Sequence, residues 1–157
     1  MGSGCCCLEV PALDCQTRVG RELEGTSSAR PEFGGLLLSL QTVADTVDAL
    51  ILSDNESVLK TIQQWVGEGG KATLANVPDA DILREILAVL SSRITAGSAT
   101  FLVKVKSHRG EPLNEKADLL AEQGRRESDE KTRWNERTGR TVFSLDKQDD
   151  VCVHTSA

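Results

Sequence analysis

The sequence lacks any apolar run near the roughly 20 residues that a helix needs to cross a bilayer. It also lacks an excess of positive charge, since 18 lysines and arginines stand against 24 aspartates and glutamates, for a formal net charge of -6. We therefore expect neither a membrane-spanning protein nor a nucleic-acid binder held by bulk positive charge. Any contact with nucleic acid must be local, or must use cations that mask carboxylates.

Cysteine spacing suited to zinc is missing as well. The five cysteines include three adjacent residues, at 5–7, and no Cys-x-x-Cys or Cys/His pattern. No secretory signal is evident, so we expect free thiols in a reducing, intracellular setting. Two interpretations of the first residues stay open: a lipid anchor on Gly2 and Cys5, or a β-strand over residues 4–10.

The amino acids that are present suit one ordinary globular domain. The chain has 157 residues, of which 39% are hydrophobic and 27% charged. Periodic apolar residues end near Arg125, and the chain beyond is charged and aperiodic. We expect a domain over residues 1–126 and a charged, flexible tail over residues 127–157.

Two periodicities alternate along the chain and predict an α/β fold. Apolar residues spaced by three or four positions predict helices, and short β-compatible runs predict strands. The expected strands cover 4–10, 15–23, 47–53 and 99–106; the expected helices run from Glu32 to 44, from 54 or 55 to Gly67, from Asp79 or Asp81 to Gly97, and from 113 to 125. The first two strands should be antiparallel and the other two parallel, giving a mixed sheet flanked by helices.

Four polar residues are expected at one edge of this sheet. Asp54 and His108 follow the two parallel strands, and ligands gather at the carboxyl ends of such strands. Glu32 begins the first helix, and Asp118 lies early in the last one. Converging carboxylates suit Mg²⁺ or Mn²⁺ and could support a paired-metal site, with the histidine moving a proton. Each residue also has a plainer interpretation, as a helix cap, a first-turn acid, a loop histidine or a solvated helix residue.

Three segments decide between these interpretations by resemblance to a known family. The final strand, histidine loop and last helix of ribonuclease H resemble residues 103–126 (VKVKSHRGEPLNEKADLLAEQGRR). The family's central strand resembles residues 49–65 (ALILSDNESVLKTIQQW), and its first helix resembles residues 27–40 (SSARPEFGGLLLSL). They occur in the family's order, and the resemblance covers roughly residues 4–126. The surrounding pattern, including the segment WNERTGRTVF, resembles the ribonuclease H domains carried by retroelements.

The resemblance implies a function and a set of site residues. Glu32, Asp54 and Asp118 would be ligands of two Mg²⁺ or Mn²⁺ ions, and His108 would handle a proton. Arg30 and Asn114 would lie near the substrate. The chain would then be an endonuclease that hydrolyses the RNA strand of an RNA–DNA hybrid. We expect a monomer.

One part of the family pattern has no counterpart. The family begins with a strand that ends in an Asp-Gly-Ser motif, whose aspartate bridges both metals, whereas residues 1–4 here enter at the second strand. Asp14 falls in the expected hairpin turn, away from that position. We therefore expect an N-terminally truncated fold, an incomplete metal site and low or absent cleavage. The alternative function is a catalytically inactive module that binds hybrids or other partners.

Overall fold

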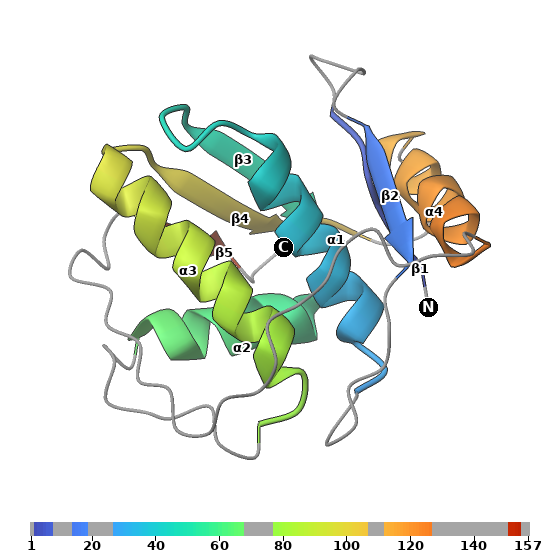
Figure 1. Ribbon diagram of the computed structural model, residues 1–157, viewed down its shortest axis with the longest axis horizontal. Helices are drawn as coiled ribbons and strands as arrows, with labels where there is room; N and C mark the ends of the chain where they lie inside the picture. Colours follow the sequence, from blue (N-terminus) through green and yellow to red (C-terminus); the bar gives the residue numbers. More distant parts are fainter. Residues whose placement is uncertain are drawn as a thin grey trace.

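The computed structural model describes residues 2–7, 14–18, 27–67, 77–106, 112–126 and 151–154. The helices and strands alternate in the order that the sequence predicts (Figure 1). Their bounds are β1 (Gly2–Cys5), β2 (Cys15–Arg18), α1 (Arg30–Thr42), β3 (Ala49–Ser53), α2 (Glu56–Gly67), α3 (Ala80–Ala96), β4 (Thr100–Lys104), α4 (Pro112–Arg125) and β5 (Val151–His154). The predicted α/β class is confirmed. Within the described ranges, no helix is long and apolar enough to cross a membrane.

The strands form two small sheets. β1 pairs antiparallel with β2, and β3 pairs parallel with β4, both as predicted. The structure adds β5, which pairs parallel with β4 and falls in the segment that the sequence predicts as a tail. The mixed strand directions thus divide between two sheets instead of sharing one. α1 contacts strands of both sheets and connects them.

The main core lies between β4 and the first three helices. Leu102 of β4 is fully buried against apolar side chains of α1, α2 and α3. On the opposite face of the same strands, Leu50 and Leu52 of β3 and Phe101 of β4 are exposed. One face of this sheet therefore packs against the helices. This packing holds β3 and β4, and with them the ends of both strands, in a fixed position.

A buried arginine holds the segment that leads into β3. Arg93 of α3 donates hydrogen bonds to Thr100 Oγ1 at 2.9 Å, to the Ala44 carbonyl at 3.1 Å and to the Val47 carbonyl. α3 ends beside it at Gly97, whose φ of 81° is a left-handed conformation that glycine adopts without strain. These contacts fix where β3 begins and hence where it ends.

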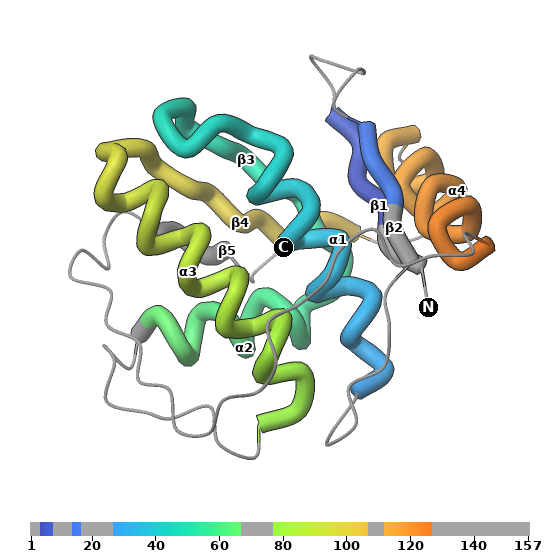
Figure 2. Tube along the Cα trace, viewed as in Figure 1, coloured from blue at the N-terminus to red at the C-terminus, as the bar shows by residue number. Residues whose placement is uncertain are grey.

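β1 lies between two helices. A Cβ on Gly4 would lie 2.6 Å from Leu120 Cβ and 2.6 Å from the Ala121 nitrogen, so α4 packs directly on the backbone of this strand. On its other side, the Gly4 carbonyl oxygen is 3.3 Å from the Cβ position of Gly35 in α1. The hairpin and α4 lie together beside α1 in Figure 2. The position of α4 relative to α1 therefore depends on the hairpin that packs between them.

Candidate functional site

The candidate site lies where β3 and β4 end. Because these strands are parallel and in register from Ala49 opposite Thr100 to Ser53 opposite Lys104, their carboxyl ends reach the same edge. The Val105 nitrogen donates a hydrogen bond of 2.9 Å to the Ser53 carbonyl, which extends the pairing to the last residue of β3. Asp54 is the next residue, so its side chain begins at this edge.

Asp54 is not the residue that caps α2. The Asn55 side-chain oxygen accepts a hydrogen bond of 3.1 Å from the Val58 nitrogen, which is the contact an N-cap residue makes. The sequence left Asp54 and Asn55 as equal candidates for this position. The Asp54 carboxylate instead accepts a long hydrogen bond, 3.5 Å, from the side-chain amide of Asn114. Asp54 is therefore directed at α4 and not at its own helix.

Glu32 supplies the second carboxylate of the site from the first turn of α1. Although its side chain keeps contact with solvent, surrounding atoms desolvate its carboxyl group, and this burial raises the pKa of Glu32. The negative charges of Asp54 and Asp118 raise the same pKa further. Three carboxylates from distant parts of the sequence thus lie close enough for their charges to interact.

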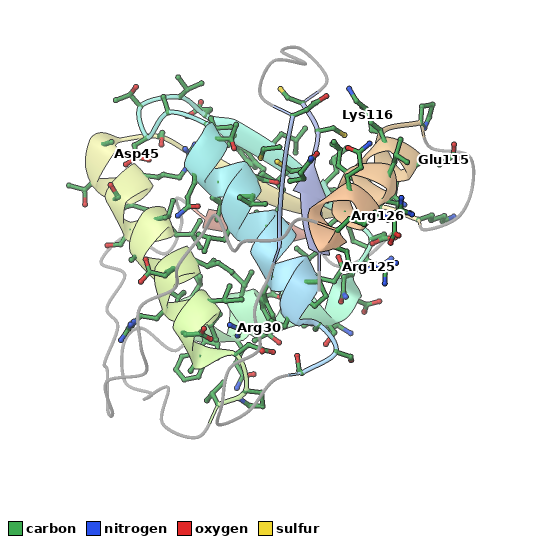
Figure 3. The ribbon with its side chains drawn as sticks, turned by 45° about the vertical axis from the view of Figure 1, so that its right-hand side comes forward. Arg30, Asp45, Glu115, Lys116, Arg125 and Arg126 are labelled. Atoms are coloured by element: carbon green, nitrogen blue, oxygen red, sulfur yellow. The ribbon has the colours of Figure 1, made fainter. Side chains whose placement is uncertain are left out.

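Two contacts with the hairpin hold the first turns of α4, which carry Asn114 and Asp118. The Cys6 thiol donates a hydrogen bond of 3.1 Å to the Leu113 carbonyl. Lys116, labelled in Figure 3, forms an ion pair with Asp14. Asp14 also accepts a hydrogen bond of 2.8 Å from the Cys7 nitrogen, so its role in the described contacts is to hold the hairpin against α4.

Arg30 has a different environment from the one expected of a substrate-binding residue. Its guanidinium is 2% exposed and donates two hydrogen bonds to Asp81, at 2.8 and 2.7 Å, and one to Asp79 at 3.3 Å. These contacts join Arg30, the first residue of α1 and labelled in Figure 3, to the start of α3. The arrangement favours a structural role, because the donors that would meet a substrate already bind buried carboxylates. His108 lies outside the described residues.

The donor chemistry of the site suits a hard divalent cation. Three carboxylates and the side-chain amide of Asn114 offer oxygen ligands of the kind that Mg²⁺ and Mn²⁺ prefer. A cation between them would also relieve the repulsion that raises the Glu32 pKa. Among the described residues, however, no group of three or more His, Cys, Asp or Glu side chains is close enough to hold a metal ion.

Several of these features have no counterpart in the sequence pattern. From the sequence, either Asp79 or Asp81 could be the first residue of α3. Nothing in their spacing indicates that both form ion pairs with Arg30. The Lys116–Asp14 ion pair joins residues about a hundred positions apart, beyond the reach of any periodicity. Lys104, the last residue of β4, lies close enough to Glu56 of α2 to lower the pKa of that carboxyl group, although Lys60 lowers it more.

The family follows from comparison with known proteins. The RNase H family model matches residues 2–126, and the chain belongs to this family. It is 30% identical to a ribonuclease H of Polaromonas naphthalenivorans over 106 residues, which cover 64% of this chain and 63% of that protein. It is 32% identical to a ribonuclease HI of Caulobacter vibrioides over 107 residues (66% of this chain, 70% of that protein) and 32% identical to a ribonuclease H of Marinobacter nauticus over 118 residues (72% and 76%).

The matched part thus amounts to less than two thirds of the Polaromonas protein. No solved structure matches the chain significantly.

Proposed function

We propose that this chain binds RNA–DNA hybrids and hydrolyses their RNA strand with the help of divalent cations. The observation that carries the proposal is the position of Asp54 directly after β3, where its carboxylate accepts a hydrogen bond from Asn114 of α4 and its charge, with that of Asp118, acts on Glu32 of α1. Carboxylates that repel one another beside the end of a parallel strand are an arrangement that a cation stabilises. Family membership supplies the substrate class.

The residues of the site have different proposed roles: some bind the cations, and others orient those ligands or carry a proton. Glu32, Asp54 and Asp118 would hold the cations, and Asn114 fixes the carboxylate of Asp54 through its amide. When bound, the divalent cations would neutralise the phosphate and lower the pKa of a water. His108 is proposed to carry a proton at the rim of the site. We also propose that 2′-hydroxyl groups, present only in the RNA strand, determine which strand is cut.

The expected rate is low. The described acids repel one another but do not by themselves form a closed ligand set. A cation held by too few ligands binds weakly, so activity should need high concentrations of Mg²⁺ or Mn²⁺. A monomeric state and a retroelement-like origin remain predictions.

The test is cleavage of an end-labelled RNA–DNA hybrid in Mg²⁺ and in Mn²⁺. Asp54→Asn should abolish the cleavage, because it removes a ligand charge and little volume. Asp45→Asn is the matched control, since Asp45 precedes β3 at the opposite end of the sheet and its exposed side chain accepts a hydrogen bond of 2.6 Å from the Ser92 hydroxyl. Equal cleavage by wild type and Asp54→Asn would contradict the proposal.

A second function is favoured by the absence of a closed metal cluster among the described residues. In this alternative the chain binds the hybrid without cutting it. Binding of the hybrid by wild type and by Asp54→Asn with similar affinity, and no cleavage in either metal, would support the binding module. Loss of both binding and cleavage in the wild type would exclude both functions.

A further inference from the structure

Two cysteines face each other across the β1–β2 hairpin. The strand register places Cys5 directly opposite Cys15, and their sulfur atoms are 2.9 Å apart. Both are free thiols. Cys5 is buried, while Cys15 is half-buried and lies 3.4 Å from the Thr42 hydroxyl of α1. The pair is separate from the acidic site, whose carboxylates come from α1, the residue after β3, and α4.

The geometry of this pair is close to that of a disulfide. Directly opposed residues of antiparallel strands have Cα atoms about 4.5–5.5 Å apart, which falls within the range that disulfides span. A disulfide has a sulfur–sulfur distance of about 2.0 Å, so closing the gap requires small rotations of two side chains. The hairpin backbone does not need to move.

The two thiols are also chemically unequal. Cys5 and Cys15 share a hydrogen bond, and this contact, with burial of Cys5, raises the pKa of Cys5. The same hydrogen bond lowers the pKa of Cys15 to about 6, assisted by the Thr42 hydroxyl and opposed by burial and by Asp14. Cys15 is therefore the more acidic of the two thiols and forms the thiolate, the species that attacks disulfides, more readily than Cys5.

We propose that Cys5 and Cys15 form a redox-responsive pair that closes to a disulfide in the presence of a low-molecular-weight disulfide. The Cys15 thiolate attacks one sulfur of the reagent, whose sulfur–sulfur bond breaks and releases one reagent thiolate. Cys5 then loses its proton to water, and its sulfur attacks that of Cys15 in the mixed disulfide. The second reagent thiolate leaves, so two protein thiols are oxidised and one reagent disulfide is reduced to two thiols.

Closure would fix β1 to β2 next to two helices. β1 packs against α4 through Gly4 and against α1 through Gly35, so the cross-link would stabilise the layer that positions α4. It would leave Glu32, Asp54 and Asp118 unchanged. The expected effect is a rise in Tm on the order of 5 °C, reversed by dithiothreitol.

The experiment treats the full chain with oxidised glutathione at pH 7, stops the exchange with acid, and then blocks the remaining thiols with excess alkylating reagent after unfolding the chain near neutral pH. Cleavage after glutamate separates residues 1–9, which carry Cys5, Cys6 and Cys7, from residues 10–22, which carry Cys15. Mass spectrometry should then show these two peptides joined, with Cys6 and Cys7 alkylated and a mass about 2 Da below the sum of the same two peptides with Cys5 and Cys15 as free thiols. Absence of the joined peptides would overturn the proposal.

Single variants identify the partners. Cys6→Ser and Cys7→Ser should retain the joined peptides and the rise in Tm, whereas Cys5→Ser and Cys15→Ser should lose both. Equal cross-linking in Cys5→Ser would show that a neighbouring cysteine is the true partner and would overturn the assignment. Cys5→Ala should also slow alkylation of Cys15 at pH 7 several-fold, because the hydrogen bond that lowers its pKa is removed. An unchanged rate would contradict the proposed roles of the two thiols.

Discussion

The side-chain nitrogen of Asn114 lies 3.5 Å from Oδ2 of Asp54, joining two residues that are 60 positions apart. This contact connects α4 to the end of β3 and orients a carboxylate of the proposed site. Asn114→Ala should therefore lower hybrid cleavage by about 10–100-fold, the range found when a residue that orients a metal ligand is removed. Stability should change little, because Asn114 is only half-buried.

The control for this prediction is Gln123→Ala, an amide removed from an exposed position near the other end of α4. Both variants should unfold at similar urea concentrations, and only Asn114→Ala should lose activity. Equal activities would show that the contact does not serve catalysis.

Glu32 should make the folded protein less stable as the pH rises. Its pKa is raised in the folded state by burial and by Asp54 and Asp118, so the folded chain holds this proton more tightly than the unfolded chain. Stability is therefore greatest below the ordinary glutamate pKa of about 4.3 and falls as the pH rises through the folded pKa. Glu32→Gln should remove this fall and raise Tm at pH 7 in the presence of EDTA, while abolishing cleavage.

The measurement is Tm between pH 4 and pH 8 for wild type, Glu32→Gln and Glu115→Gln. Glu115 is an exposed glutamate in the first turn of α4, so its variant makes the same charge change outside the proposed ligand set. Mg²⁺ should raise the Tm of the wild type more than that of Glu32→Gln. Parallel pH profiles for all three proteins would show that Glu32 is not under electrostatic strain.

The sequence predicts the elements well because apolar periodicity directly reflects burial. The helix predicted from Glu32 to 44 and the strand predicted over 47–53 correspond to α1 (Arg30–Thr42) and β3 (Ala49–Ser53), and both predicted strand pairings are present. β5 was missed, since Val151–His154 is short and follows a long polar stretch. The division of the strands between two sheets was missed as well, because periodicity within a strand says nothing about its neighbour.

The site was harder to predict than the fold. Asp54 and Asn55 are both common N-cap residues, so only the Asn55–Val58 hydrogen bond distinguishes them. Arg30 matches a substrate-binding position by motif, but its partners Asp79 and Asp81 come from about fifty positions away. Local spacing identifies which residue types occur at a strand end or helix start, and tertiary packing decides which groups they meet.

Arg30→Met should be strongly destabilising. The substitution leaves the carboxylates of Asp79 and Asp81 buried without their cation, which typically costs about 3–5 kcal/mol. Arg125→Met is the control, because Arg125 pairs with Glu122 on the exposed surface of α4, where solvent screening leaves such a pair with little effect on stability. Urea unfolding measures both changes. A cost for Arg30→Met as small as that for Arg125→Met would show that the buried network is not needed for stability.

Gly4→Ala should disturb the site from a distance. The new Cβ would lie 2.6 Å from Leu120 Cβ and from the Ala121 nitrogen, and 2.8 Å from the Ala117 carbonyl oxygen, so α4 must move away from β1. Such overpacking costs about 1–3 kcal/mol. Because α4 also carries Asn114 and Asp118, cleavage at temperatures where the variant is folded should fall as well. Urea unfolding and the hybrid cleavage assay together separate the two effects.

Gly35→Ala tests whether the effect of Gly4→Ala comes from the close packing of β1 on α4. Its Cβ position is 3.3 Å from the Gly4 carbonyl oxygen, a tight but adjustable contact, and alanine is favoured over glycine inside a helix by about 1 kcal/mol. The two effects oppose each other, so Gly35→Ala should be nearly neutral in stability and activity. If Gly4→Ala were equally neutral, the packing of α4 on β1 would not control the position of Asp118, and the proposed path from hairpin to site would be wrong.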